Sequence, residues 1–154
     1  MNTGEKQPTL PFAATSNLQG HLDDYRGQWL ILYFYPKDAT PGCTTEGQNF
    51  RDLYPEFAKL NAVIFGVSRD NLKAHEQFKA KQQFPFELIS DTDETLCQAF
   101  DVIKMKNMFG KQVRGIERST FLIDPEGTIR HTWQKVKVKN HAQEVLDTLK
   151  SLQH

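Results

Sequence analysis

One cysteine in this sequence lies where a thiol could act as a nucleophile. Cys43 belongs to "FYPKDATPGCTTEGQNF" (34–50), which passes from an aromatic run through a proline and glycine loop into a polar, helix-like segment. Thr40 fits the N-cap of that helix and Pro41 its first position, so Cys43 would be the third helical residue. The first turn has backbone N–H groups without helical partners and lies at the positive end of the helix dipole. Both features favour the thiolate, which is the nucleophilic form.

A packed, unreactive thiol is the alternative for Cys43, because cysteine is among the most frequently buried residue types. Polar segments on both sides, "KDATPG" and "TTEGQN", favour the reactive interpretation and predict a sulfur that is open to a small oxidant. Glu46 stands where a Cys-X-X-Cys motif would have its second cysteine, since the sequence reads "CTTE". Dithiol exchange within this motif is therefore excluded.

The second cysteine, Cys97, is expected to be a packed core thiol. It lies beside Leu96 and three residues before Phe100, in a short amphipathic stretch, and buried free cysteines commonly behave as small hydrophobic residues. Two cysteines do not make a disulfide framework. The five histidines form no ligand spacing with either cysteine, so no metal site is expected.

Length and composition exclude several classes of function. The 154 residues suggest a single domain over 1–154. Lys+Arg and Asp+Glu both number 19, so nothing in the charge indicates a nucleic acid or an anionic membrane as partner. No apolar run approaches the ~20 residues that span a bilayer. The polar N-terminal segment lacks the apolar core of a signal peptide, which predicts a cytoplasmic location.

The hydrophobic pattern predicts alternating strands and helices. The expected strands are 27–36, 62–68, 84–91 and two within 113–136 that meet at the turn "DPEG". The expected helices are 43–60, 71–84, 93–103 and 140–153. Pro55 is expected to end or kink the first helix near Tyr54, and Asn140 is expected to cap the last one. This order predicts an α/β domain with a thioredoxin-like fold, in which helices flank a mixed β-sheet.

The segment around Cys43 resembles the active-site motif of peroxiredoxins. Pro36, Thr40 and Cys43 match Pro-X-X-X-Thr-X-X-Cys, and "GQWLILYFYP", "VIFGVSRD", "LISDTDETLCQAFDV" and "GIERSTFLIDPEG" follow the pattern of the peroxiredoxin Q, or bacterioferritin-comigratory-protein, subfamily. The resemblance implies a thiol-dependent peroxidase without a bound cofactor. It would reduce hydrogen peroxide and organic hydroperoxides while Cys43 becomes a sulfenic acid.

The same resemblance implies roles for four residues. The hydroxyl of Thr40 and the N–H of Cys43 would bind the peroxide, and Pro36 would shield the pocket. Arg118, from a distant strand, would stabilise charge on the peroxide oxygens and favour the thiolate. Each residue also has a simpler interpretation. Thr40 could act merely as a helix cap, and Pro36 could merely end a strand. Arg118 could form a surface ion pair.

The resolving cysteine of two-cysteine subfamily members is missing here. Such members carry it five residues after the reactive cysteine or in the next helix, positions that Gln48 and Lys79 occupy in this chain. We therefore predict a one-cysteine mechanism in which glutathione, glutaredoxin or thioredoxin reduces the sulfenic acid. Gly47 is expected to let the helix turn around Cys43 open for that reductant. The resemblance also suggests a monomer or weak homodimer.

Three alternatives remain open at this point. Cys97 could act as an atypical resolving thiol. The chain could instead be a thioredoxin-fold protein that exchanges mixed disulfides without peroxidase activity. It could also be a binding module in which Cys43 is incidental.

Overall fold

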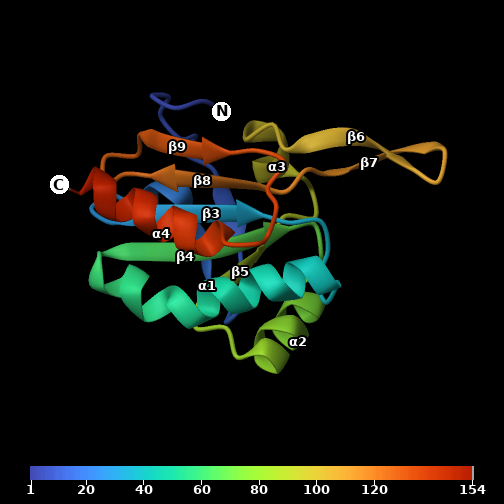
Figure 1. Cartoon of the computed structure of the whole chain (residues 1–154), viewed down its shortest axis with the longest axis horizontal. Coiled ribbons are helices and arrows are strands. Elements are labelled where there is room, and N and C mark those ends of the chain that lie inside the picture. Colours follow the sequence, from blue (N-terminus) through green and yellow to red (C-terminus); the bar gives the residue numbers. More distant parts are fainter. Residues whose placement is uncertain (154) are drawn as a thin grey trace.

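A five-stranded mixed sheet forms the centre of the molecule (Figure 1). The computed structural model describes residues 1–153. Strand order in the sheet is β5-β4-β3-β8-β9. The strands run over β3 Trp29–Phe34, β4 Ala62–Ser68, β5 Glu87–Ser90, β8 Ser119–Ile123 and β9 Ile129–Trp133. β3, β4 and β5 are parallel, whereas β8 pairs antiparallel with both β3 and β9.

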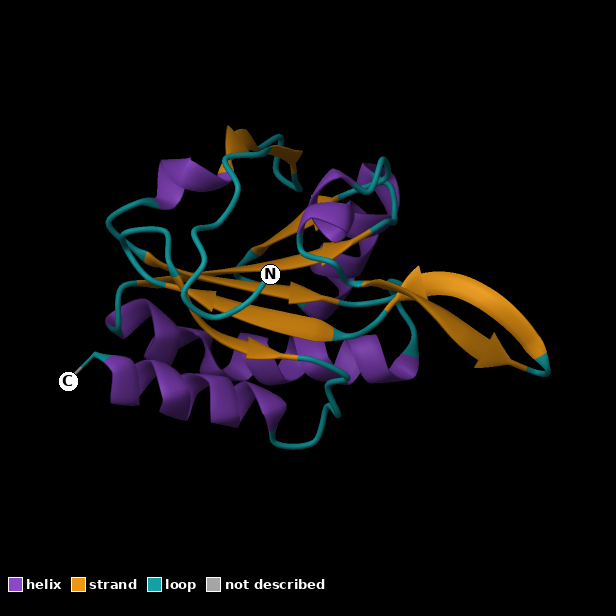
Figure 2. Cartoon of the chain, turned by 90° about the horizontal axis from the view of Figure 1, so that it is seen from above, coloured by secondary structure: helices purple, strands orange, loops and turns teal. Residues whose placement is uncertain are grey.

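Helices cover both faces of this sheet, as the sequence predicts (Figure 2). Residues 1–153 contain four α-helices, namely α1 Pro41–Lys59, α2 Leu72–Gln82, α3 Thr95–Ala99 and α4 His141–Leu152. α1 and α4 lie together on one face, and α3 lies on the other with the short 3-10 helix η1, Leu22–Tyr25. Two small strands, β1 Pro11–Ala13 and β2 Gln19–His21, form a separate hairpin.

The central strand β3 divides the hydrophobic core in two because its side chains alternate between the faces. All six of its residues are buried. Tyr33 faces a cluster, here called the α1 core, that also contains Cys43, Phe50, Phe57, Phe84 and Leu146. Phe34 faces a second cluster, here called the α3 core, that also contains Leu22, Leu96, Cys97, Phe100 and Phe121. The sheet therefore separates the two cysteines.

Helix α1 continues through Pro55 to Lys59, so the prediction that the helix ends near Tyr54 is wrong. A proline inside a helix removes one backbone hydrogen bond and costs about 3 kcal/mol. Phe50 and Phe57 lie on either side of Pro55 in the chain, and both are fully buried in the α1 core. Burial of one such side chain contributes about 2–3 kcal/mol, which is enough to keep the helix continuous.

A hairpin of β6 Ile103–Met108 and β7 Lys111–Ile116 extends away from the body of the molecule, and the sequence pattern did not predict it (Figure 1). Its turn consists of Phe109 and Gly110, both with positive φ (54° and 80°), as tight hairpin turns require. Phe109 is fully exposed. The predicted strand over 113–123 is thereby divided, because β7 ends at Ile116 and β8 begins at Ser119.

The start of α4 also differs from expectation. Asn140 precedes the helix, but it has a left-handed backbone (φ 61°) and its side chain makes no capping hydrogen bond. A cap needs extended backbone geometry to aim the side-chain oxygen at the free N–H groups. Within residues 1–153, no helix has both the length and the apolar character needed to cross a membrane.

Candidate active site

Cys43 lies in the first turn of α1, as predicted. Thr40 is the N-cap residue, with extended geometry (φ −79°, ψ 155°), and Pro41 is the first helical residue. The Thr40 side chain does not cap the helix, because its Oγ1 donates to the carbonyl of Lys37 at 2.8 Å. This hydroxyl therefore closes the loop between β3 and α1, and the simple capping interpretation of Thr40 is wrong.

The sulfur of Cys43 is buried, with 2% of the residue exposed. The prediction of an open sulfur is therefore wrong. Successive helical residues point about 100° apart, so Thr45 is exposed while Cys43 faces the α1 core and Glu46 is buried beside it. The site is nevertheless polar at the sulfur itself, because the guanidinium of Arg118 lies against it.

Arg118 connects Cys43 to a buried carboxylate. It lies directly before β8, and its side chain is 16% exposed. Nη2 is 3.3 Å from Cys43 Sγ, and Nη1 donates to Glu46 Oε1 at 2.5 Å. A Cβ atom on Gly42 would lie 3.3 Å from Arg118 Nη2, so the glycine lets the guanidinium approach the helix backbone. The arrangement differs from the exposed surface ion pair that was the alternative for Arg118.

Two buried groups near Arg118, Glu46 and His141, have shifted pKa values. Burial raises the pKa of Glu46 to about 7, against the opposing attraction of the Arg118 guanidinium. Burial and the Arg118 charge lower the pKa of His141 to about 4. His141 Nε2 lies 2.8 Å from Thr120 Oγ1. At neutral pH His141 is therefore uncharged, and Arg118 is the cation that contacts the sulfur.

Pro36 lies in the same loop as Thr40, between β3 and α1, and is half-buried. It lines a surface cavity of about 340 Å³, together with Lys37, Arg69, Asp70, Thr92 and Glu94. Thr40 is the N-cap residue of the helix turn that contains Cys43, and Arg118, from a segment distant in the sequence, contacts Cys43. The structure thus brings Cys43 and Arg118 into contact, with Thr40 at the start of α1 and Pro36 in the preceding loop.

Cys97 is a packed thiol, as predicted for its simpler role. It is 0% exposed and belongs to the α3 core. Its backbone N–H donates to Asp91 Oδ2 at 2.8 Å, and burial together with the Asp91 carboxylate raises the pKa of its thiol well above the usual range. Both cysteines are free, and the sheet lies between them.

The two positions where a resolving cysteine was sought hold ordinary structural contacts. Gln48 Nε2 donates to Gln82 Oε1 at 2.9 Å, and Lys79 Nζ lies 3.3 Å from Glu87 Oε1. Gly47, expected to loosen the turn, instead marks close packing. A Cβ atom there would lie only 2.4 Å from the ring of buried Phe84.

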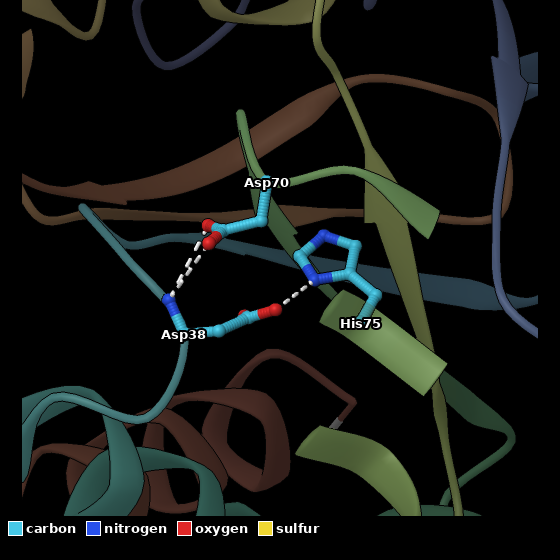
Figure 3. A group of neighbouring side chains, drawn as sticks. All are labelled: Asp38, Asp70 and His75. Atoms are coloured by element: carbon cyan, nitrogen blue, oxygen red, sulfur yellow. Dashed lines mark hydrogen bonds and ion pairs between the residues drawn. The ribbon is translucent and has the colours of Figure 1, made fainter. Parts of the chain in front are cut away.

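Sequence reasoning missed a polar cluster beside the loop between β3 and α1, in which Asp38 and His75 are buried and Asp70 is partly buried. Asp38, Asp70 and His75 have carboxylate and imidazole atoms within 4.8 Å of one another (Figure 3). Such a group resembles a cation site, but both nitrogens of His75 are already hydrogen-bonded within the chain. The sequence positions of Asp38 and Asp70 could have indicated the cluster, because the two residues follow the carboxyl ends of adjacent parallel strands.

The α/β fold and the site together define a class of protein: a thioredoxin-like domain that presents one thiol, covered by an arginine, at the start of a helix. The sequence model of the AhpC/TSA family matches residues 3–132, and the chain belongs to this family. The chain is 59% identical to peroxiredoxin Bcp of Xanthomonas campestris pv. campestris over 142 residues, which is 92% of this chain and 89% of that protein.

Solved structures agree with this assignment. The bacterioferritin comigratory protein of X. campestris, described for its alkyl peroxide reduction activity, has 54% identity and a TM-score of 0.93, with 99% of this chain and all of that chain covered. A mutant of PrxQ from Xylella fastidiosa has 50% identity and a TM-score of 0.96, with 100% and 98% covered. The predicted thioredoxin-like fold and peroxiredoxin family are confirmed, and the chain is a thiol-dependent peroxidase.

Proposed function

We propose that this peroxidase uses Cys43 as its peroxidatic residue in a one-cysteine mechanism, with an external thiol as reductant. One observation carries the proposal: Arg118 Nη2 lies 3.3 Å from Cys43 Sγ while Nη1 is held by Glu46. An arginine fixed in this way favours the thiolate electrostatically. It also has its donors in place before the reaction, so none must be reorganised during O–O cleavage.

In the first step, the Cys43 thiolate attacks the terminal oxygen of a hydroperoxide. An S–O bond forms and the O–O bond breaks, so that Cys43 becomes a sulfenic acid and the remaining alkoxide or hydroxide takes a proton from solvent. Arg118 and the N–H of Cys43 stabilise the charge that develops on the oxygens. The Thr40 hydroxyl orients the peroxide, and Pro36 shields the pocket from water.

In the second step, an external thiol attacks the sulfur of the sulfenic acid. Water leaves, a mixed disulfide forms, and a second thiol releases Cys43 as the free thiol with formation of the reductant's disulfide. The position of Cys97 supports an external reductant, because it is fully buried in the α3 core on the other face of the sheet. Gln48 and Lys79 offer no thiol in its place.

The proposed substrates are hydrogen peroxide and organic hydroperoxides. We include alkyl hydroperoxides because the X. campestris relative is described for its alkyl peroxide reduction activity. Glutathione, glutaredoxin and thioredoxin are the proposed reductants. A single domain over 1–154, a monomer or weak homodimer, and a cytoplasmic location stay predictions.

The test is to treat the protein with one equivalent of an alkyl hydroperoxide and to identify the oxidised residue by mass spectrometry of dimedone-trapped peptides. We expect sulfenic acid on Cys43 and unmodified Cys97. The Cys43→Ser variant should consume no peroxide with any of the three reductants. A disulfide between Cys43 and Cys97 in the wild-type protein would overturn the one-cysteine mechanism, and peroxide consumption by Cys43→Ser would overturn the role of Cys43.

A further inference from the structure

The loop that carries Pro36 and Thr40 is anchored to the protein interior by one side chain. Asp38 is the buried member of residues 36–40, with 8% exposed. Its Oδ2 lies 2.6 Å from His75 Nδ1, and its Oδ1 accepts a hydrogen bond from the Tyr35 hydroxyl at 2.7 Å. Its backbone N–H faces both carboxylate oxygens of Asp70 at 3.3 Å (Figure 3).

We propose that His75 is a positioning residue for the peroxidatic site. Acting through Asp38, it holds the loop between β3 and α1 so that the Thr40 hydroxyl stays where the peroxide binds. This inference rests on the proposed role of Thr40 in the function above. His75 itself is 0% exposed and comes from α2, an element that contributes no other residue to the site.

The hydrogen bonds of His75 determine how it joins the loop to the sheet. Nε2 lies 2.9 Å from the carbonyl oxygen of Ile89 in β5. A carbonyl only accepts hydrogen bonds, so Nε2 carries a proton. The other ring nitrogen, Nδ1, contacts Asp38 Oδ2. Both nitrogens are occupied, and the imidazole is a bridge between the sheet and the active-site loop rather than a free ligand for a cation.

The loop needs such an anchor because its backbone is strained. Ala39, between Asp38 and Thr40, has a φ of +63°, a left-handed conformation that costs an L-residue about 1–2 kcal/mol. Strained residues of this kind persist only where their surroundings over-determine them. The hydrogen bond from Thr40 Oγ1 to the Lys37 carbonyl spans the strained turn. If Asp38 loses its partner, the turn relaxes and the Thr40 hydroxyl shifts relative to Cys43.

A purely structural role for His75 makes different predictions. His75 also packs near the rings of the α1 core, including Tyr35 at 6.3 Å between centroids. If it only filled space, its loss would lower stability and leave the surviving folded protein fully active. Arg118 contacts Cys43 directly, without help from the loop. A reaction of Cys43 that does not need the Thr40 hydroxyl should therefore be spared if His75 only positions the loop, and should be impaired if the whole site is damaged.

The experiment compares two reactions of Cys43 in His75→Leu and His75→Asn. The first is oxidation by an alkyl hydroperoxide in a single turnover, and the second is alkylation by iodoacetamide, with folding checked by circular dichroism. A displacement of about 1 Å costs up to about 100-fold in rate, so we expect His75→Leu to oxidise at least about 10-fold more slowly. Alkylation should not slow, because it needs no Thr40 hydroxyl and a relaxed loop does not hinder access to the sulfur. His75→Asn keeps a donor near the Nδ1 position and should recover part of the oxidation rate.

A double-mutant cycle with Thr40→Val identifies the residue through which His75 acts. Oxidation by Thr40→Val should be slow, and adding His75→Leu should slow it little further. Additive effects, or an unchanged oxidation rate in His75→Leu, would overturn the positioning role. If Thr40→Val itself oxidises at the wild-type rate, the proposed function of Thr40 fails instead.

A milder variant keeps the test valid if His75→Leu does not fold. Tyr35→Phe removes only the hydroxyl that donates to Asp38 Oδ1. It should slow oxidation by a smaller factor than the loss of Thr40, without slowing alkylation. Wild-type oxidation in Tyr35→Phe, with His75→Leu unfolded, would count against the proposal.

Discussion

Arg118 donates to Cys43 Sγ through Nη2 at 3.3 Å and to Glu46 Oε1 through Nη1 at 2.5 Å. The guanidinium is planar and presents several donors in fixed directions. One end is therefore held by a buried carboxylate while the other faces the reactive sulfur. Arg118 and Cys43 are 75 residues apart in the sequence, so only the tertiary fold produces this contact.

Replacement of Arg118 by lysine should lower kcat/KM for an alkyl hydroperoxide by about 100-fold, the typical cost of removing one preorganised donor. Lysine keeps the charge but cannot contact Glu46 and the sulfur at the same time with fixed geometry. Arg130→Lys is the matched control, because Arg130 pairs with Asp124 and lies over the Trp29 ring, away from Cys43. Equal activity in the two variants would contradict the proposed role of Arg118.

Cys97→Ala should turn over peroxide at the wild-type rate with an external thiol. The substitution removes a fully buried sulfur from the α3 core, so it should lower the free energy of unfolding by about 1–2 kcal/mol. Steady-state peroxide consumption and urea denaturation measure the two effects. A variant that still forms sulfenic acid on Cys43 but no longer turns over would instead make Cys97 the resolving thiol.

Glu46→Gln should change how stability depends on pH. Glutamate ordinarily titrates near 4.5, and burial raises the pKa of Glu46 to about 7. Between these values the folded protein keeps a proton that the unfolded chain has lost, so the contribution of Glu46 to stability is present below pH 4.5 and is lost as pH rises through about 7. Relative to Glu46→Gln, the wild-type protein should lose about 3 kcal/mol of unfolding free energy across this range.

His141 acts in the opposite direction and makes a comparison of variants necessary. Its pKa is lowered from 6.5 to about 4, so its contribution is present above pH 6.5 and is lost as pH falls through about 4. The two effects partly cancel in the wild-type protein. Urea denaturation of the wild type and Glu46→Gln at matched pH values isolates the contribution of Glu46. A constant difference between them from pH 4.5 to 7 would show that Glu46 does not titrate there.

Gly47→Ala should destabilise the protein by about 1–3 kcal/mol, the usual cost of overpacking a core. The added Cβ would lie 2.4 Å from the ring of Phe84, which is itself stacked on Phe86. Thr45→Ala, at an exposed position of the same helical turn, is the control and should change the unfolding free energy little. If Gly47→Ala is as stable as the wild type, this turn is less tightly packed than its geometry indicates.

Local sequence rules predicted the parts of the molecule that depend on neighbours in the chain. Thr40 and Pro41 start a helix in a way that short-range backbone geometry determines, so the place of Cys43 in the first turn was predictable. The strand over 62–68 was predicted with the observed bounds, because a strand buried on both faces is a continuous apolar run. The motif around Cys43 and the order of the segments also identified the family.

Long-range packing decided the rest. The helical pattern could not show that Cys43 faces inward beneath Arg118, nor that the sheet separates it from Cys97. Pro55 was misjudged because the burial of aromatic side chains around it outweighs a local backbone penalty. The pairing of Asp38 with His75 could not be predicted either, because the two residues are distant in the sequence. Contacts between residues that are distant in the sequence depend on how the helices and strands pack. Local sequence patterns carry no information about that packing.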